Sequence, residues 1–129
     1  MFAFTKLMQA MAAAAGSYTV VQTFTATGTW TAPAGVTSVD YLVVAGGGSG
    51  GTGGGGGGAG GLIDRPGFMV NAAQSYTVTI GAGGGGVGTW GSSGNIGSDS
   101  IFDVLTAKGG GRGSHRDANN QGGSSGGEC

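Results

Sequence analysis

The longest glycine tract is the feature that most restricts how this chain can fold. Thirteen of the sixteen residues at positions 46–61 are glycine, and the exceptions are Ser49, Thr52 and Ala59. Ser49 and Thr52 are three residues apart, and three residues make one turn of the polyproline II helix. The spacing therefore predicts a polyglycine II rod in which Ser49 and Thr52 share one edge.

Another edge of this rod would carry no side chain at all. It runs through Gly48, Gly51, Gly54, Gly57 and Gly60. Two such rods can approach backbone to backbone, as the chains of collagen do where glycine lies at the axis. We therefore expect the tract to pack against other rods, either as one long rod or as a hairpin of two shorter rods.

Ordering so many glycines is costly. Each glycine costs about 0.5 to 1 kcal/mol more to order than alanine, so thirteen cost on the order of 6 to 13 kcal/mol. A polyglycine II rod has no internal hydrogen bonds, whereas each hydrogen bond to a neighbouring rod returns about 1 kcal/mol. Shorter glycine tracts at 81–88, 109–113 and 122–127 can supply neighbours. We predict a bundle of parallel and antiparallel rods that is completed by other copies of the chain.

Short apolar runs with a period of two indicate a β framework that carries the rods. Residues 17–27 alternate between two faces, and residues 36–45, 75–80 and 100–107 are rich in valine, isoleucine and aromatic residues. These patterns are typical of strands. We predict a mainly β domain with polyglycine rods over residues 17–129.

The first sixteen residues have a different composition, rich in alanine and methionine, which are good helix formers. A helical spacing of three and four places four apolar side chains on one face: Phe4, Leu7, Met8 and Met11. An isolated helix of this length is marginal in water. We predict an α-helix over residues 1–16 that docks on a neighbouring subunit or on a partner protein.

A signal peptide is the alternative interpretation of the same segment, because residues 12–15 are all alanine. The match is poor, since the single positive charge at Lys6 follows two phenylalanines and Gln9 interrupts the apolar stretch. We expect the segment to be retained.

Several motifs resemble the glycine-rich domain of bacteriophage tail fibres and virion proteins. They are Thr23-Phe24-Thr25, Gly28 to Thr37 with its Trp30 and Pro33, Leu42 to Gly48, Tyr76 to Gly84 and Leu105 to Gly111. Their order and spacing match over positions 23–127. The resemblance implies a β framework with polyglycine II rods, a trimeric fibre and contact with the host surface. It also implies localisation in the virion, with assembly in the cytoplasm of the bacterial host.

Composition and charge disfavour several other classes of protein. The net charge is −1, so there is no basic field to attract a nucleic acid. No stretch reaches the roughly 20 apolar residues that a membrane span needs, and the single Cys129 cannot form an intramolecular disulfide. The carboxylates show no pairing suited to acid–base catalysis. We expect a protein that is not an enzyme and that needs no cofactor or metal.

Asp99 is the residue that comes nearest to a metal motif. It lies in a nonapeptide, residues 94–102, that is close to the repeat of calcium-binding β-rolls. Such sites form between stacked turns, and the chain has one copy. We expect Asp99 to be a turn residue that opens the last strand.

Six polar or aromatic residues between the rods are candidates for contact with a receptor: Trp90, Asn95, His115, Arg116, Asn119 and Asn120. Aromatic rings, amides and basic groups on loops can bind sugars or lipopolysaccharide phosphates. The alternative is structural, with Trp90 capping the hydrophobic framework and the others in solvated turns.

These observations predict a structural virion protein of a bacteriophage, part of a fibre or spike tip that contacts a host surface polysaccharide. Two alternatives remain at this stage. One is a decoration or cement protein of the capsid or tail without receptor binding. The other is an extracellular glycine-rich structural or ice-binding protein, for which flat polyglycine faces are suited.

Overall fold

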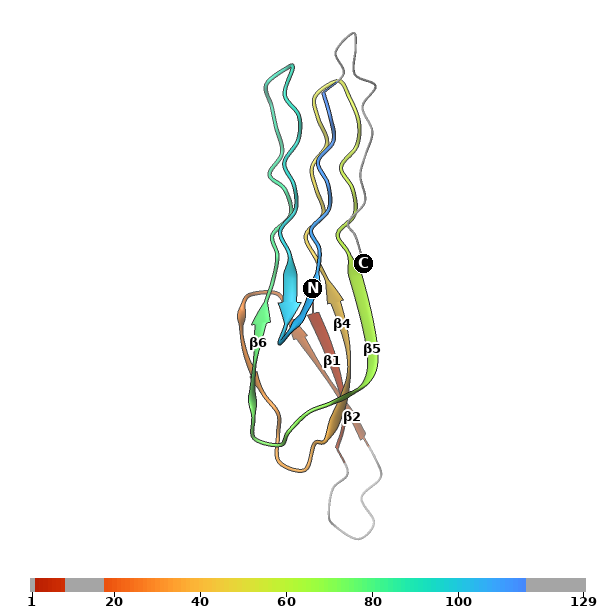
Figure 1. Cartoon of the computed structure of the whole chain (residues 1–129), viewed down its shortest axis with the longest axis vertical. Helices are drawn as coiled ribbons and strands as arrows, with labels where there is room; N and C mark the ends of the chain where they lie inside the picture. The colour runs from red at the N-terminus through yellow and green to blue at the C-terminus, as the bar shows by residue number, and fades with distance from the viewer. Residues whose placement is uncertain (1, 9–17, 116–129) are drawn as a thin grey trace.

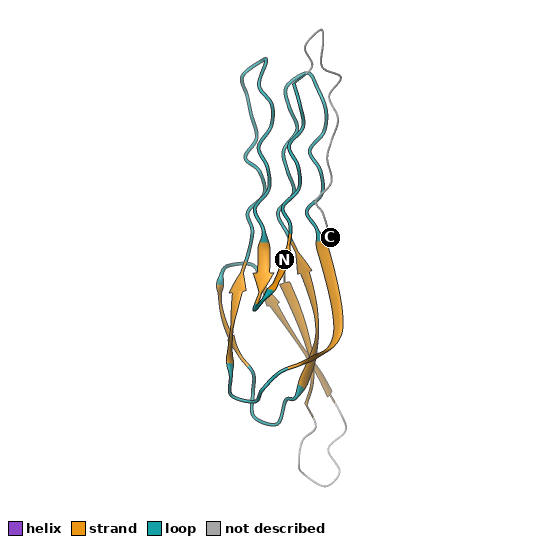
Figure 2. Ribbon diagram, viewed as in Figure 1, coloured by secondary structure: helices purple, strands orange, loops and turns teal. Residues whose placement is uncertain are grey.

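The computed structural model describes residues 2–8 and 18–115. Two antiparallel β-sheets pack against each other, and long extended segments leave one end of them side by side (Figure 1). Coloured by secondary structure, these segments are loops and the described part of the chain contains strands but no helix (Figure 2). The mainly β architecture is thus confirmed.

The first sheet has the strand order β2-β1-β4-β5. The central strands β1 (Phe2–Met8) and β4 (Ser38–Val44) pair with each other. β2 (Tyr18–Phe24) lies outside β1, and β5 (Leu62–Met69) lies outside β4. All three pairings are antiparallel.

The second sheet has the strand order β3-β6-β7-β8 and is also antiparallel. Its strands are β3 (Gly28–Thr31), β6 (Ser75–Thr79), β7 (Ser100–Phe102) and β8 (Leu105–Ala107). The predicted run at 100–107 is therefore a hairpin of two short strands. Its turn includes Asp103, which has a positive φ of 55°.

The helix predicted over residues 1–16 is wrong where the structure describes this segment, because Phe2–Met8 form β1. Residues 9–16, which include Met11 of the predicted apolar face, lie outside the described residues. β1 pairs with strands on both sides, so its backbone groups gain hydrogen bonds from two neighbours. Helix propensity amounts to less than about 1 kcal/mol per residue, and such pairing can override it.

An aromatic cluster centred on Phe102 fills the space between the sheets. Phe102 is fully buried and its ring centroid lies 4.9 Å from that of Tyr41 and 5.7 Å from that of Tyr76. Trp30 and Phe68 complete the cluster at 6.2 and 5.8 Å. Tilted and edge-on contacts of this kind stabilise aromatic pairs beyond the area they bury. The cluster therefore fixes how one sheet sits on the other.

Five described segments continue the strands beyond the sheets, and we call them rods. Rod 1 (45–52) follows β4, and rod 2 (55–61) returns to β5. Rod 3 (80–88) follows β6, and rod 4 (92–99) returns to β7. Rod 5 (108–115) follows β8. Rods 1, 3 and 5 run away from the sheets and rods 2 and 4 run back (Figure 1). The long glycine tract is thus a hairpin of two rods.

Hydrogen bonds between rods recur at every third residue. The amides of Gly48 and Gly51 in rod 1 donate to the carbonyls of Gly58 and Gly55 in rod 2, at 2.9 and 3.1 Å. The amide that follows each of these donors along rod 1 bonds to rod 4. The amide of Ser49, for example, donates to the carbonyl of Asn95 at 2.9 Å. A repeat of three is that of the predicted polyproline II type of helix. Parallel and antiparallel rods thus bond one another within a single chain.

Rod 1 lies at the centre of this network. Its carbonyls at Gly46 and Ser49 accept the amides of Gly110 and Gly113 in rod 5, at 2.8 and 2.9 Å, and the carbonyl of Gly47 accepts an amide of rod 3. It therefore bonds to all four other described rods.

The shared edge predicted for Ser49 and Thr52 is confirmed. The Ser49 hydroxyl accepts the amide of Asn95 at 2.8 Å, and the Thr52 hydroxyl accepts the amide of Ser92 at 3.1 Å. Both hydroxyls therefore face rod 4 and bond to it three residues apart. These two side chains take the place of backbone acceptors in the network.

The side-chain-free edge explains why so many glycines are needed. A Cβ atom added to Gly57 would clash with the carbonyl oxygen of Gly48, and one added to Gly48 would clash with that of Gly111. Gly56, by contrast, has nothing within 4 Å of such an atom. The rods can approach this closely only where the facing residue lacks a side chain.

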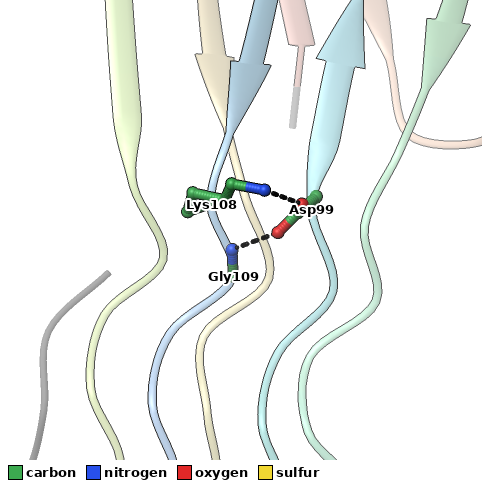
Figure 3. Close-up of polar contacts among 3 residues, drawn as sticks. All are labelled: Asp99, Lys108 and Gly109. Atoms are coloured by element: carbon green, nitrogen blue, oxygen red, sulfur yellow. Dashed lines mark hydrogen bonds and ion pairs between the residues drawn. The ribbon is translucent and has the colours of Figure 1, made fainter. Parts of the chain in front are cut away.

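Asp99 fastens rod 4 to rod 5 where both leave the second sheet (Figure 3). One carboxylate oxygen pairs with the Lys108 ammonium at 2.8 Å, and the other accepts the amide of Gly109 at 2.8 Å. The hydrogen bond from Lys108, followed by that from Gly109, lowers the pKa of Asp99. Asp99 directly precedes β7, as predicted, but it lies at the end of rod 4 and not in a turn, and β8 follows as the last strand.

The packing of the rods predicts opposite effects for two neighbouring substitutions. Gly57→Ala should lower the free energy of unfolding by about 2 kcal/mol or more, because its methyl group meets a backbone carbonyl that cannot move aside. The matched control Gly56→Ala should change it by less than about 1 kcal/mol, in the stabilising direction, because alanine reduces the entropy of the unfolded chain. Urea unfolding measures both. Equal losses would show that the rods are not in close contact at Gly57.

The junction at Asp99 predicts a pH-dependent contribution to stability. A carboxylate with a lowered pKa in the folded state stabilises the fold above its ordinary pKa near 4, and this contribution is lost as the pH falls below that range. Asp99→Asn should therefore be less stable than the wild type at pH 7 but close to it at about pH 3. Urea unfolding at the two pH values tests this, with Asp64→Asn on β5 as an exposed control. A difference that persists at pH 3 would contradict the electrostatic explanation.

Candidate functional site

The end of the rod bundle farthest from the sheets brings three segments together, and we call it the distal tip (Figure 1). It consists of Thr52 and Gly53, residues 89–93, and His115. The Thr52 hydroxyl donates to the carbonyl of Thr89 at 2.9 Å, and the Thr52 amide donates to the carbonyl of Ser92 at 3.0 Å. These bonds tie the loop between rods 1 and 2 to the loop between rods 3 and 4.

Trp90 is the most prominent side chain of the distal tip. It is 80% exposed, although tryptophan is the largest side chain. Its ring edge lies against Gly53, where an added Cβ atom would be 2.7 Å from Cη2 of the indole. Gly53 also has a positive φ of 67°, so glycine is required there for two reasons.

His115 holds the second side of the indole and bonds to the first loop. Its ring lies edge-on to that of Trp90, with centroids 6.0 Å apart and planes at 75°. Its Nδ1 lies 2.6 Å from the carbonyl oxygen of Thr52, and its amide donates to the hydroxyl of Ser93 at 3.3 Å. A carbonyl can only accept a hydrogen bond, so the proton of a neutral His115 must be on Nδ1.

Two of the six residues predicted for receptor contact are therefore neighbours, Trp90 and His115. The alternative in which Trp90 caps the hydrophobic framework is wrong, because the side chain is exposed, lies against Gly53 and is not packed on the core. Arg116, Asn119 and Asn120 lie outside the described residues.

Asn95 is placed elsewhere, at the level of Ser49 along the rods. Its side-chain amide donates to the carbonyl of Gly85 at 2.7 Å, and the Ser49 hydroxyl donates to the same oxygen at 2.8 Å. Asn95 is exposed but it also bonds rod 4 to rod 3. The structure thus shows a contact within the bundle for this residue.

Sequence reasoning did not identify Gly53 and Ser93 as part of the site. Thr52 was recognised only as a residue on one edge of a rod. Nothing in the local sequence indicates that Gly53 lies against Trp90, 37 positions later, or that the Ser93 hydroxyl bonds to the amide of His115, 22 positions later. Only the return of the chain along neighbouring rods brings them together.

Comparison with known proteins gives one result. Residues 19–129 match the family model described as a glycine-rich domain. The chain belongs to the glycine-rich domain family. The matched region begins within β2, so all five described rods and the distal tip lie inside the glycine-rich domain. No curated protein and no solved structure matches the chain.

The distal tip of this glycine-rich domain presents aromatic and hydrogen-bonding groups. An exposed indole, an imidazole and several hydroxyls converge there, and these groups form contacts by stacking and hydrogen bonding. Within residues 2–8 and 18–115 no group of three or more His, Cys, Asp or Glu residues is placed to hold a metal. The same residues form no helix with the length and apolar character to cross a membrane.

Proposed function

We propose that the protein is a structural component of a bacteriophage virion, part of a fibre or spike tip whose distal end contacts the host surface. The observation that supports this most directly is the exposed Trp90 at the end of a bundle of hydrogen-bonded rods. Water does not favour an exposed indole, and a large aromatic side chain held at a projecting tip is typical of a contact with a partner.

The arrangement of the molecule supports a division of roles between its two ends. The rods project the distal tip away from the sheets (Figure 1). The sheets expose apolar side chains of their own, at Val21, Leu62 and Met69, and we propose that this end attaches to other virion proteins. The resemblance of the motifs to phage tail fibres makes a homotrimer the proposed assembly.

Adsorption of the purified protein to host cells tests this function. We compare Trp90→Ala with Val104→Ala, because both side chains are 80% exposed but Val104 lies in the turn between β7 and β8. Trp90→Ala should reduce cell-bound protein about tenfold or more, as expected for an aromatic residue at the centre of a contact. Val104→Ala should leave adsorption unchanged.

Equal adsorption of both variants, or no adsorption of the wild type, would contradict the proposal. A decoration or cement protein without a receptor would then be the better explanation. Thermal hysteresis in a solution of the wild type would instead indicate an ice-binding protein.

A further inference from the structure

We infer that the distal tip binds the ring of a neutral pyranose sugar, which stacks on Trp90 and donates a hydroxyl hydrogen bond to Nε2 of His115. This inference rests on the proposed function and specifies the ligand of the same site. The observation behind this inference is that the exposed ring of Trp90 lies beside an oriented hydrogen-bond acceptor, Nε2 of His115.

The indole of Trp90 offers a flat apolar surface of the size of a sugar ring. A pyranose presents C–H groups on its faces and hydroxyls around its edge. The C–H groups are attracted to the negative face of an aromatic ring, as the positive edges of other aromatic rings are. Trp90 is held by Gly53 and His115 before any ligand arrives, so little ordering cost falls on binding.

His115 supplies a polar group of defined character. Because Nδ1 donates to the carbonyl of Thr52 at 2.6 Å, Nε2 of the neutral ring carries a lone pair and accepts a hydrogen bond. Nε2 of His115 has no hydrogen-bond partner within the described residues. A sugar hydroxyl is the kind of donor that fits this acceptor, and the indole N–H of Trp90 can donate to another hydroxyl.

The described residues of the distal tip offer a ligand a flat ring and hydrogen-bonding groups. None of the described residues of the distal tip carries a fixed charge, since they are threonine, glycine, tryptophan, serine and a histidine. The ion pair of Lys108 and Asp99 lies at the opposite end of rods 4 and 5 (Figure 3). Uncharged hydroxyls can bind to these groups without a cation.

The test is a titration of the full chain with methyl pyranosides of glucose, galactose, mannose and N-acetylglucosamine, followed by the NMR signal of the Trp90 indole N–H. At least one glycoside should bind with a Kd of about 1 to 10 mM, as expected for so small a ligand. The acyclic alcohol sorbitol, which has hydroxyls but no ring face, should not bind in this range.

Variants separate the two roles in the same titration. Trp90→Phe keeps an aromatic surface and should weaken binding less than Trp90→Ala, which should weaken it about tenfold or more. Both variants lack the indole N–H, so their binding is followed by the NMR signal of the Gly53 amide, which lies next to position 90. His115→Asn places an amide donor near the position of Nδ1 but removes Nε2, so it should keep the bond to Thr52 and still weaken binding several-fold. Val104→Ala should bind like the wild type.

The failure of this inference differs from the failure of the proposed function. If none of the glycosides binds, or if Trp90→Ala binds as well as the wild type, the inference is overturned even where Trp90 is needed for adsorption to cells. Wild-type affinity of His115→Asn would overturn the role of Nε2. Glycoside binding without adsorption to host cells would support the inference and contradict the proposed function.

The source of the sugar is resolved on cells. Adsorption that survives protease treatment and is inhibited by the bound glycoside supports a surface polysaccharide, and purified lipopolysaccharide and capsular polysaccharide distinguish its two sources. Adsorption that protease abolishes and no glycoside inhibits would show a protein receptor and contradict the proposed contact with a polysaccharide.

Discussion

The hydrogen bond between backbones of neighbouring rods is the interaction on which the rest of the structure depends. Each rod has no internal hydrogen bonds, so its amides and carbonyls must be satisfied by neighbours or by water. The bonds at Gly48, Gly58 and Gly110 are possible only because the facing residues have no side chain. The core around Phe102 orients the sheets, the sheets space the rods, and the rods bring Trp90 to the tip.

Features with a short sequence repeat could be predicted. The spacing of Ser49 and Thr52 indicated a threefold rod and the edge that they share, and hydrogen bonds to rod 4 confirm it. A run that is apolar on both faces indicated β4 as a central strand, and alternating apolar residues indicated β6. These predictions succeeded because the repeat of the backbone itself decides which side chains face inward.

Features that depend on distant parts of the chain could not be predicted. The segment Phe2–Met8 has the composition of a helix, but β2 and β4 offer hydrogen bonds on both of its sides. β5 was missed because Pro66 and Gly67 interrupt its pattern, although an edge strand tolerates both residues. Likewise, the contact of Trp90 with Gly53 and His115 joins three loops that are adjacent only after the rods have assembled.

Amide hydrogen exchange of the glycine-rich segments tests the central claim most directly. In rod 1 the amides of Gly48 and Gly51 donate to rod 2, whereas those of Gly47 and Gly50 have no partner among the described residues. We predict slow exchange at Gly48 and Gly51 and fast exchange at Gly47 and Gly50, in a pattern with a period of three. Uniformly fast exchange across rod 1, at the rate of an unstructured peptide, would contradict the account.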